Sequence, residues 1–409
     1  MDKEEVKTII EEMRTAVNML EGEVDDERVR GLIDEKLLSD PRFTYRKVDE
    51  MKALMDRIFL ALRRDLYILD PLLRDKEVNE IMVNGPEAVY TERKGRLVRE
   101  DVTFESEKAL TDIMQRLAGR VDREINELHP IVDARLAGGS RVNGVHGSLS
   151  LHGPLLTIRK FPESTYSMED LISFGMVSEV CAAFLKVMVE SGYNIFISGG
   201  TSSGKTTFLN ALSEYIPAEQ RVVVIEDSAE LAIHHIPNLV RMECRQSNGE
   251  GKGDVAMDRL IKTSLRMRPD RIIVGEVRGK EVVEMIKAMN TGHDGSLSTG
   301  HGNSIRGMLR RLESMFLQGT DFPLEAIRSQ IGEGLDIMIH LGRLGGKRMV
   351  LEVAELREEE GKMQLNYLFR YVNGKGLLPT GLGLQNTTKL TLYGGPGYPP
   401  LPQKEAPYA

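Results

Sequence analysis

Apolar residues recur at helical spacing through the first 70 residues of the chain. One series is Val6, Ile9, Ile10, Met13, Val17 and Leu20, and a second is Met51, Leu54, Met55, Ile58, Phe59 and Leu62. Charged residues fill the other faces of both series. The pattern predicts an N-terminal helical extension over residues 1–70. We favour a helical layer packed on the next domain, and a docking arm for a partner is the alternative.

From residue 71 the helical period gives way to short apolar runs. Turn signals such as Asn84-Gly85 and Lys94-Gly95 separate these runs, which is typical of strands. A helix is expected at about 107–119, and strands broken by glycine follow it. The pattern predicts a small α/β domain over 71–161. The polar stretch 162–170 has no apolar period and is expected to be a linker.

Strands and helices alternate in the second half of the chain. We expect helices at 178–191 and 205–216, and buried strands at 193–198, 221–225 and 271–274. Such alternation predicts a mostly parallel sheet. Two helices beyond residue 304 precede a hairpin at Gly345-Gly346. A second α/β domain is therefore expected over 171–373, and irregular or mobile chain in the Gly- and Pro-rich tail, 374–409.

Composition narrows the class of protein. The 409 residues include 62 acidic and 54 basic side chains, a net charge of −8, so no direct nucleic-acid binding is expected. No apolar run approaches the about 20 residues of a membrane-spanning helix, and no signal-peptide layout is present. We therefore expect a cytoplasmic protein. Cys181 and Cys244 are isolated and predicted to be buried apolar side chains, not partners in a zinc site or disulfide.

The segment ISGGTSSGKTTFLNAL, residues 197–212, contains the P-loop pattern between an expected strand and an expected helix. Glycines allow successive backbone N–H groups to point at one phosphate, and the helix start adds further donors. Lys205 can reach the β and γ phosphates, and the Thr206 hydroxyl can hold Mg²⁺. The predicted nucleotide-binding residues are Gly199, Gly200, Thr201, Ser202, Ser203, Gly204, Lys205, Thr206 and Thr207.

Carboxylates follow two of the expected strands. Glu226 and Asp227 come after the strand at 221–225, with Glu230 close behind. Ligands of open α/β sheets bind at the carboxyl ends of strands, so this cluster can hold Mg²⁺ or its waters, or can simply cap a helix. Glu276 follows the strand at 271–274, where the usual Walker B aspartate is missing. It is the best candidate to orient and deprotonate an attacking water.

Two histidines lie in the glycine-rich stretch NTGHDGSLSTGHGN, residues 290–303. No third Cys or His completes a metal-ligand set there. For His293 and His301 we prefer hydrogen bonding to the γ-phosphate or the water over a structural role.

These motifs, in this order, resemble those of the type II/IV secretion ATPase family. IEDSAEL is similar to its Asp box, LRMRPDRIIVGEVRG to its atypical Walker B and AMNTGHDGSLSTGHGN to its His box. EIMVNGP, PIVDARL, GSRVN and LTIRKF resemble the Flp/Tad pilus branch, the CpaF-like ATPases. The resemblance implies a RecA-like ATPase domain with a smaller PAS-like α/β N-terminal domain, and six chains in a ring. It also implies ATP hydrolysis with Mg²⁺ at the cytoplasmic face of the membrane, driving platform proteins of a pilus or secretion system.

The resemblance also implies roles for individual residues. Lys205 and Thr206 match the Walker A pair and Glu276 the Walker B glutamate, while Asp227 and Glu230, with Thr206, are the implied metal ligands. Glu226, His293 and His301 are implied in catalysis. Family members bring arginines from the N-terminal domain to the nucleotide, and the arginines in the matching segments are Arg135, Arg141 and Arg159. A surface salt bridge is the alternative for each of the three.

The chain departs from the family pattern at three places, one of which is HGSLSL in place of a proline-rich turn. It reads LAGGSR where the branch has LPDGSR, so that the branch's Asp is missing, and TGHGN where the branch has TIHAN. Gly300 and Gly302 are expected to loosen the His box. A nucleotide-gated scaffold with little turnover therefore stays open as an alternative, and a motor for DNA conjugation or pilus retraction would carry the same motifs.

Overall fold

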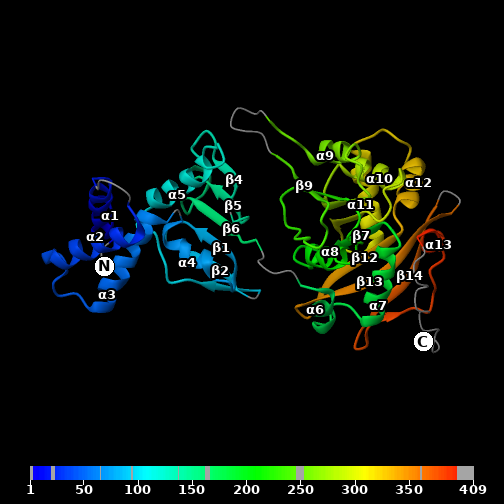
Figure 1. Cartoon of the computed structure of the whole chain (residues 1–409), viewed down its shortest axis with the longest axis horizontal. Helices are drawn as coiled ribbons and strands as arrows, with labels where there is room; N and C mark the ends of the chain where they lie inside the picture. The colour runs from blue at the N-terminus through cyan, green and yellow to red at the C-terminus, as the bar shows by residue number, and fades with distance from the viewer. Residues whose placement is uncertain are drawn as a thin grey trace. The chain divides into compact units, whose positions relative to one another are not determined.

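The computed structural model describes residues 3–19, 24–64, 66–93, 95–136, 138–161, 166–245, 253–359 and 362–393. The chain forms two compact units that meet in sequence at residues 162 and 163. Each unit is built around its own hydrophobic core, and each is described by itself below (Figure 1).

The first unit begins with helices, as the sequence predicts. These are α1 (Lys3–Asn18), α2 (Asp26–Ser39), α3 (Val48–Arg63) and α4 (Asp70–Arg74). Buried residues on the helices, such as Met13, Ile33 and Ile58, belong to the same hydrophobic cluster as Ile81 and Val83 of the following sheet. The shared core supports the interpretation of the extension as a helical layer on the next domain.

An antiparallel sheet makes up the rest of the first unit. Its strands are β1 (Val78–Asn84), β2 (Val89–Arg93), β3 (Arg96–Arg99), β4 (Ile131–Arg135), β5 (Arg141–Val145) and β6 (Leu155–Arg159), in the order β3-β2-β1-β6-β5-β4. Helix α5 (Glu107–Gly119) matches the expected 107–119. Its buried Leu110 and Met114 share a core with Val132, Val142 and Ile158. One face of the sheet is therefore covered, and the other presents polar side chains.

The second unit contains a larger sheet with the order β15-β14-β13-β12-β7-β11-β10-β8-β9. The strands from β12 to β9 in this order run parallel, and β13, β14 and β15 are antiparallel to their neighbours. The parallel strands are β7 (Ile195–Gly199), β8 (Val222–Glu226), β9 (Leu239–Glu243), β10 (Arg271–Val277), β11 (Leu297–His301) and β12 (Ile337–Leu344). The antiparallel strands are β13 (Lys347–Glu359), β14 (Lys362–Val372) and β15 (Gly376–Pro379).

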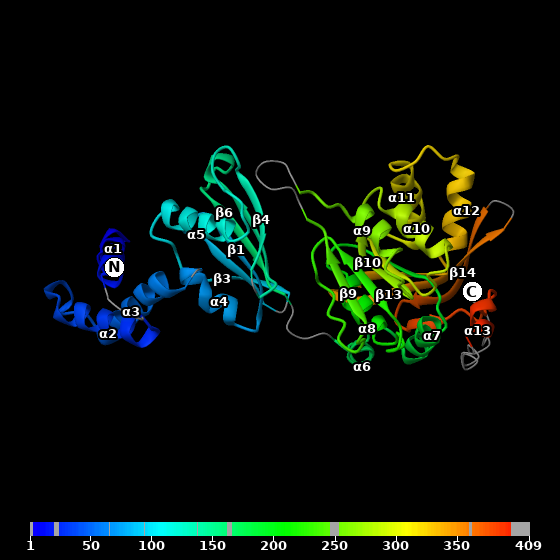
Figure 2. The ribbon, with the colours of Figure 1, turned by 45° about the horizontal axis from the view of Figure 1, so that its top comes forward.

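Helices cover both faces of this sheet (Figures 1 and 2). On one side lie α6 (Met168–Ser173), α7 (Glu179–Glu190) and α8 (Lys205–Ser213), and on the other α9 (Met257–Ser264), α10 (Val282–Asn290), α11 (Ile305–Leu317) and α12 (Leu324–Gly334). The mostly parallel, doubly covered sheet confirms the predicted α/β class. The hairpin of β12 and β13 turns at Gly345-Gly346, as expected.

The expected linker is partly structured. Residues 162–165 lie outside the described residues, but Ser167 begins α6 with a capping box in which its side chain and that of Asp170 each bond the other's amide. Segment 167–170 is therefore the start of a helix, and the prediction of a linker there is wrong. The polar residues that suggested a linker are helix-capping residues instead.

The prediction of irregular chain from residue 374 is also wrong for the described residues up to 393. Strand β15 pairs with β14, and α13 (Thr388–Leu392) follows it. Lys389 Nζ lies 2.7 Å from both Asp336 Oδ2 and Asp294 Oδ1. The buried carboxylate of Asp336 and the half-buried one of Asp294 therefore hold this segment, although its composition suggested no regular structure. Residues 394–409 of the predicted tail lie outside the described residues.

Within the described ranges, no helix is both long enough and apolar enough to cross a bilayer. Cys181 is buried as predicted, whereas Cys244 is half-buried. Burial raises the pKa of both thiols, that of Cys244 to about 11.

Candidate nucleotide-binding site

The loop between β7 and α8 has the backbone geometry of an anion cradle. Ser202 and Gly204 have φ angles of 57° and 94°, in the left-handed region. Within residues 166–245, the amides of Thr201, Ser202 and Gly204 bond no other backbone group. A side chain at Gly199 would place its Cβ 2.8 Å from the carbonyl oxygen of Leu341, so this position needs glycine. Backbone N–H groups left free at a helix start fit a phosphate.

Lys205, Glu276 and His301 form a cluster beside this loop. Lys205 Nζ lies 3.7 Å from Glu276 Oε1 and 3.3 Å from His301 Nδ1, and His301 Nε2 lies 3.1 Å from Glu276 Oε1. The ammonium can only donate, so Nδ1 of His301 accepts and the ring proton sits on Nε2, which donates to Glu276. Burial lowers the pKa of Lys205, opposed by Glu276, and burial also lowers the pKa of His301. The imidazole is therefore a neutral bridge between the two charged groups.

Strand register brings this cluster together. β11 lies between β7 and β10, and His301 is paired with Gly199. Glu276 stands at the carboxyl end of β10, which is the next strand. The carboxyl ends of parallel strands lie on the same side of the sheet, which is where open α/β sheets bind ligands. Glu276 and His301 thus lie where the sequence places them.

Glu226 lies deeper than predicted and is already fully engaged. Its side chain is buried, and its Oε1 accepts hydrogen bonds from the amides of Glu230 and Leu231 at 2.7 and 2.9 Å. Arg241 Nη2 lies 3.9 Å from the other oxygen and also bonds the carbonyl of Leu231. Burial raises the pKa of Glu226, and the two amides oppose that shift. Glu226 therefore positions the loop that carries Glu230, and its catalytic role stays a prediction.

Arg278 is a residue that the sequence prediction missed. Its Nε donates to Glu276 Oε2 at 2.8 Å, and its Nη1 lies 3.3 Å from Asp227 Oδ2. The guanidinium of Arg278 therefore holds the carboxylate of Glu276, the candidate water-activating group, and also pairs with the carboxylate of Asp227. The sequence did offer a signal for this contact: Arg278 comes two residues after Glu276, and alternate residues of a strand share a face.

Thr206 and Glu230 are the two predicted metal ligands that the structure brings into contact. Thr206 Oγ1 lies 3.2 Å from Glu230 Oε2. Mg²⁺ at a nucleotide takes one or two protein oxygens, together with phosphate oxygens and waters, so this donor pair fits the ion. Asp227 is paired with Arg278 at 3.3 Å in the structure, and its role as a ligand stays a prediction. No larger group of metal-binding side chains occurs in the described part of the chain.

The structure does not bring His293 to the P-loop. Its Nδ1 contacts the carbonyl of Ala288 at 3.2 Å, at the end of α10. His293 precedes the first residue of β11, whereas His301 ends that strand beside Gly199. The two histidines therefore lie at opposite ends of β11. The prediction that His293 bonds the γ-phosphate is wrong within this chain.

Glycines near the site are packed rather than loose. A Cβ at Gly300 would stand 2.8 Å from Phe196 Cζ and 3.0 Å from Met308 Cε, and one at Gly302 would stand 3.1 Å from Met308 Cβ. The expectation that Gly300 and Gly302 loosen the His box is therefore wrong. A Cβ at Gly275 would lie 3.0 Å from Glu226 Cγ, so the residue that replaces the usual Walker B aspartate makes room for Glu226.

The three predicted arginines form a row on the first unit. Arg135 is paired with Arg141 across β4 and β5, and Arg141 with Arg159 across β5 and β6. Directly opposed residues of antiparallel strands point to the same face, so all three side chains share the face away from α5. Gly139, next to this row, has a φ of 86°, and its carbonyl accepts a hydrogen bond from Arg135 Nε at 3.2 Å. Its backbone conformation favours glycine.

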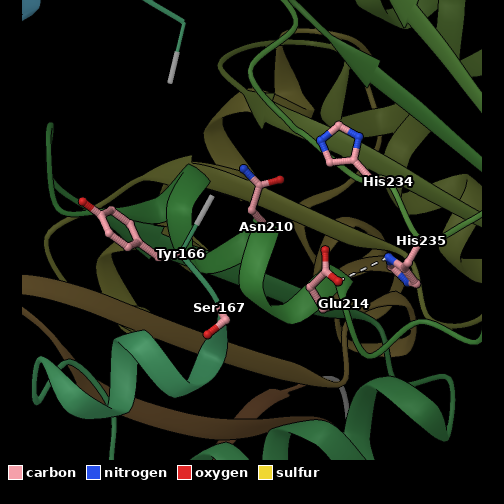
Figure 3. Close-up of a pocket in the computed structure, with 6 residues that line it drawn as sticks. All are labelled: Tyr166, Ser167, Asn210, Glu214, His234 and His235. Atoms are coloured by element: carbon pink, nitrogen blue, oxygen red, sulfur yellow. Dashed lines mark ion pairs between the residues drawn. The ribbon is translucent and has the colours of Figure 1, made fainter. Parts of the chain in front are cut away.

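A cavity of about 430 Å³ lies beside α8, separate from the P-loop (Figure 3). Its lining is Tyr166, Ser167, Asn210, Glu214, His234 and His235. Asn210 Oδ1 accepts the amide of Ala232 at 2.9 Å, and Glu214 Oε2 lies 3.6 Å from His235 Nδ1. These contacts connect α8 to the loop that follows Glu230, and they support the placement of that loop.

Comparison with known sequences adds a family match. The model of the family described as type II/IV secretion system protein matches residues 63–345. A putative conjugal transfer protein of Mycobacterium tuberculosis is 35% identical over 305 residues, which are 73% of this chain and 86% of that protein. A probable conjugal transfer protein TrbB of Sinorhizobium fredii is 33% identical over 329 residues, covering 79% and 92% of the two chains.

Comparison with solved structures supports the fold. The pilus retraction motor PilT with bound ADP aligns with a TM-score of 0.52 and 19% identity, over 72% of this chain and 84% of that one. The ATPase DotB of Legionella pneumophila gives a TM-score of 0.50 and 20% identity, over 70% and 79%. These neighbours share the arrangement of an N-terminal domain followed by a RecA-like domain.

Proposed function

Because the chain belongs to the type II/IV secretion system protein family, we propose that it hydrolyses ATP to drive a pilus assembly or protein secretion machine of the Flp/Tad type. The observation that carries the proposal is the cluster of Lys205, His301 and Glu276 at the P-loop. It combines a cation for phosphate oxygens with a carboxylate for the attacking water.

Each side chain has a distinct task in this reaction. Lys205 neutralises charge on the β and γ phosphates, and Glu276 orients the water and accepts its proton. His301 holds Lys205 and Glu276 in a common geometry through its two ring nitrogens. Thr206 and Glu230 would hold Mg²⁺, which neutralises charge on the β and γ oxygens when it is bound.

The proposal includes assembly and motion. We propose a ring of six chains at the cytoplasmic face of the membrane, bound to platform proteins. The row of Arg135, Arg141 and Arg159 would reach the nucleotide when the two domains close around it. ATP would bind more tightly to the closed state than to the open state and would therefore favour closure. Hydrolysis of the ATP would remove this stabilisation, and the domains would open again.

ATP turnover by the purified full-length chain tests the proposal. Lys205→Ala should abolish tight ATP binding, whereas Glu276→Gln should retain binding and lower turnover by on the order of 10²–10⁴, the contribution of a positioned base. Glu190→Gln on the exposed face of α7, where the carboxylate pairs with Lys186, is a matched control that should change neither. Wild-type turnover by Glu276→Gln would reject Glu276 as the base.

A second candidate is a motor for conjugal transfer. The names of the M. tuberculosis and S. fredii relatives favour it, and the site geometry suits either machine equally. Membrane proteins that copurify with the chain from its own cell would separate the two, since pilin and platform proteins indicate a pilus. A nucleotide-gated scaffold with little turnover is the remaining alternative, and the turnover assay described above decides between it and a motor.

A further inference from the structure

The groups proposed to act on the γ-phosphate all lie on one side of the P-loop strand. Glu276 is the last residue but one of β10 and His301 is the last of β11, and both strands lie on the same side of β7 in the sheet. On the other side of β7 stands the hairpin of β12 and β13. A nucleotide whose γ-phosphate faces Glu276 must therefore extend its nucleoside away from β10 and β11. That direction leads to the hairpin and the start of α8.

The hairpin continues past the end of β7. Leu341 is paired with Gly199, the last residue of β7, and the hairpin then runs on through its turn and returns along β13. Arg343 and Arg348 are paired across the two hairpin strands, and Leu344 is paired with Lys347. The projecting end of the hairpin therefore carries three basic side chains beside the P-loop.

Arg348 is the basic residue that touches the P-loop. Its Cδ lies 3.4 Å from the position that a Cβ of Gly204 would occupy, with Met176 Cε at 3.2 Å from the same point. The carbonyl of Met176 accepts the amide of Val350 at 2.8 Å, which connects the hairpin to the chain before α7. The stem of Arg348 thus lies against Gly204, the residue that directly precedes α8.

The guanidinium of Arg348 has no structural task within its own unit. The side chain is exposed, and across the described residues 166–245, 253–359 and 362–393 no carboxylate or carbonyl bonds it. The two arginines at the nucleotide site, Arg241 and Arg278, by contrast bind acidic side chains. An arginine whose aliphatic chain contacts the P-loop and whose planar guanidinium is exposed is suited to stack on an aromatic base.

We infer that Arg348 binds the nucleoside end of a purine nucleoside triphosphate, stacking its guanidinium on the base while the P-loop holds the phosphates. The inference rests on the proposed function, because it assigns the base to the same site. It makes the β12–β13 hairpin the part of the chain that distinguishes a nucleotide from a bare polyphosphate.

Equilibrium binding to the full chain tests this without requiring turnover. The dissociation constants of a non-hydrolysable ATP analogue and of inorganic tripolyphosphate are measured for wild type, Arg348→Ala and Lys347→Ala. Lys347 is the matched control, since neighbouring residues of a strand point to opposite faces. Arg348→Ala should weaken binding of the analogue about tenfold, within the range of a cation–aromatic contact, and leave tripolyphosphate binding unchanged. Lys347→Ala should change neither.

Other outcomes overturn the inference. Equal losses of analogue and tripolyphosphate affinity in Arg348→Ala would assign the arginine to the phosphates. Unchanged analogue affinity would remove it from the site, and an equal effect of Lys347→Ala would indicate a general effect of positive charge. In each of these cases the wild type still binds the analogue. Failure of the wild type to bind it at all would instead refute the proposed function, so the two failures are distinguishable.

Discussion

His301 offers the sharpest test of the site, because a glutamine can take over both of its hydrogen bonds. The ring accepts from Lys205 through Nδ1 and donates to Glu276 through Nε2, at 3.3 and 3.1 Å. His301→Ala removes both bonds, whereas His301→Gln retains one acceptor and one donor. A hydrogen bond to a charged group contributes about 1.5–3 kcal/mol, and each 1.4 kcal/mol is about tenfold in rate. With both bonds lost, turnover should therefore fall by on the order of 10²–10⁴ in His301→Ala and much less in His301→Gln.

The pH dependence of turnover gives the same test an independent readout. Burial lowers the pKa of His301, so the ring is neutral at pH 7 and becomes protonated only below its usual pKa of about 6.5. Protonation would occupy Nδ1, which then no longer accepts from Lys205 and places a second cation beside it. Turnover of the wild type should fall as the pH drops below that range, and His301→Gln should lack this acidic limb. Steady-state ATPase rates across pH 5 to 9 would measure this fall at acidic pH. The reasoning is refuted if wild type and His301→Gln show the same fall, or if His301→Gln is as slow as His301→Ala.

Three further changes have predictable outcomes. Gly300→Ala should destabilise the second unit by about 1–3 kcal/mol in urea denaturation, since its new methyl group meets Phe196 at 2.8 Å. Arg159→Ala should leave ADP affinity nearly unchanged and lower the ATPase rate; an unchanged rate would leave Arg159 as a surface charge worth under about 1 kcal/mol. Lys389→Met should cost about 3–5 kcal/mol in the same denaturation assay, because buried Asp336 loses its cation, whereas Lys186→Met at an exposed pair should cost under about 1 kcal/mol.

The helices and most strands were predictable because their buried faces repeat along the sequence. Helix α5 and the parallel strands β7, β8 and β10 follow apolar patterns that a single segment displays by itself. The P-loop was predictable for a different reason. Its residue types are set by local backbone geometry, as the positive φ angles of Ser202 and Gly204 show, and that requirement does not depend on distant parts of the chain.

Strand β11 was not predictable in the same way. Leu297 is its single large apolar residue, and the others are Ser298, Thr299, Gly300 and His301. The strand is nevertheless almost wholly buried, because it lies between β7 and β10 and the Thr299 hydroxyl bonds the carbonyl of Gly275 at 2.8 Å. Small and polar residues are accommodated there by partners from other segments, and a local reading of composition could only predict loose chain.

The fate of the two histidines shows where prediction of the site reached its limit. His293 and His301 share one glycine-rich motif, and chemistry alone gives both the same role. Once the intervening residues form a strand, one histidine precedes its start and the other ends it beside Gly199. Residue type therefore predicted which side chains suit a phosphate, but only the direction and register of β11 decided which of them reaches it. The same register makes His301, rather than His293, the residue whose substitution should alter turnover.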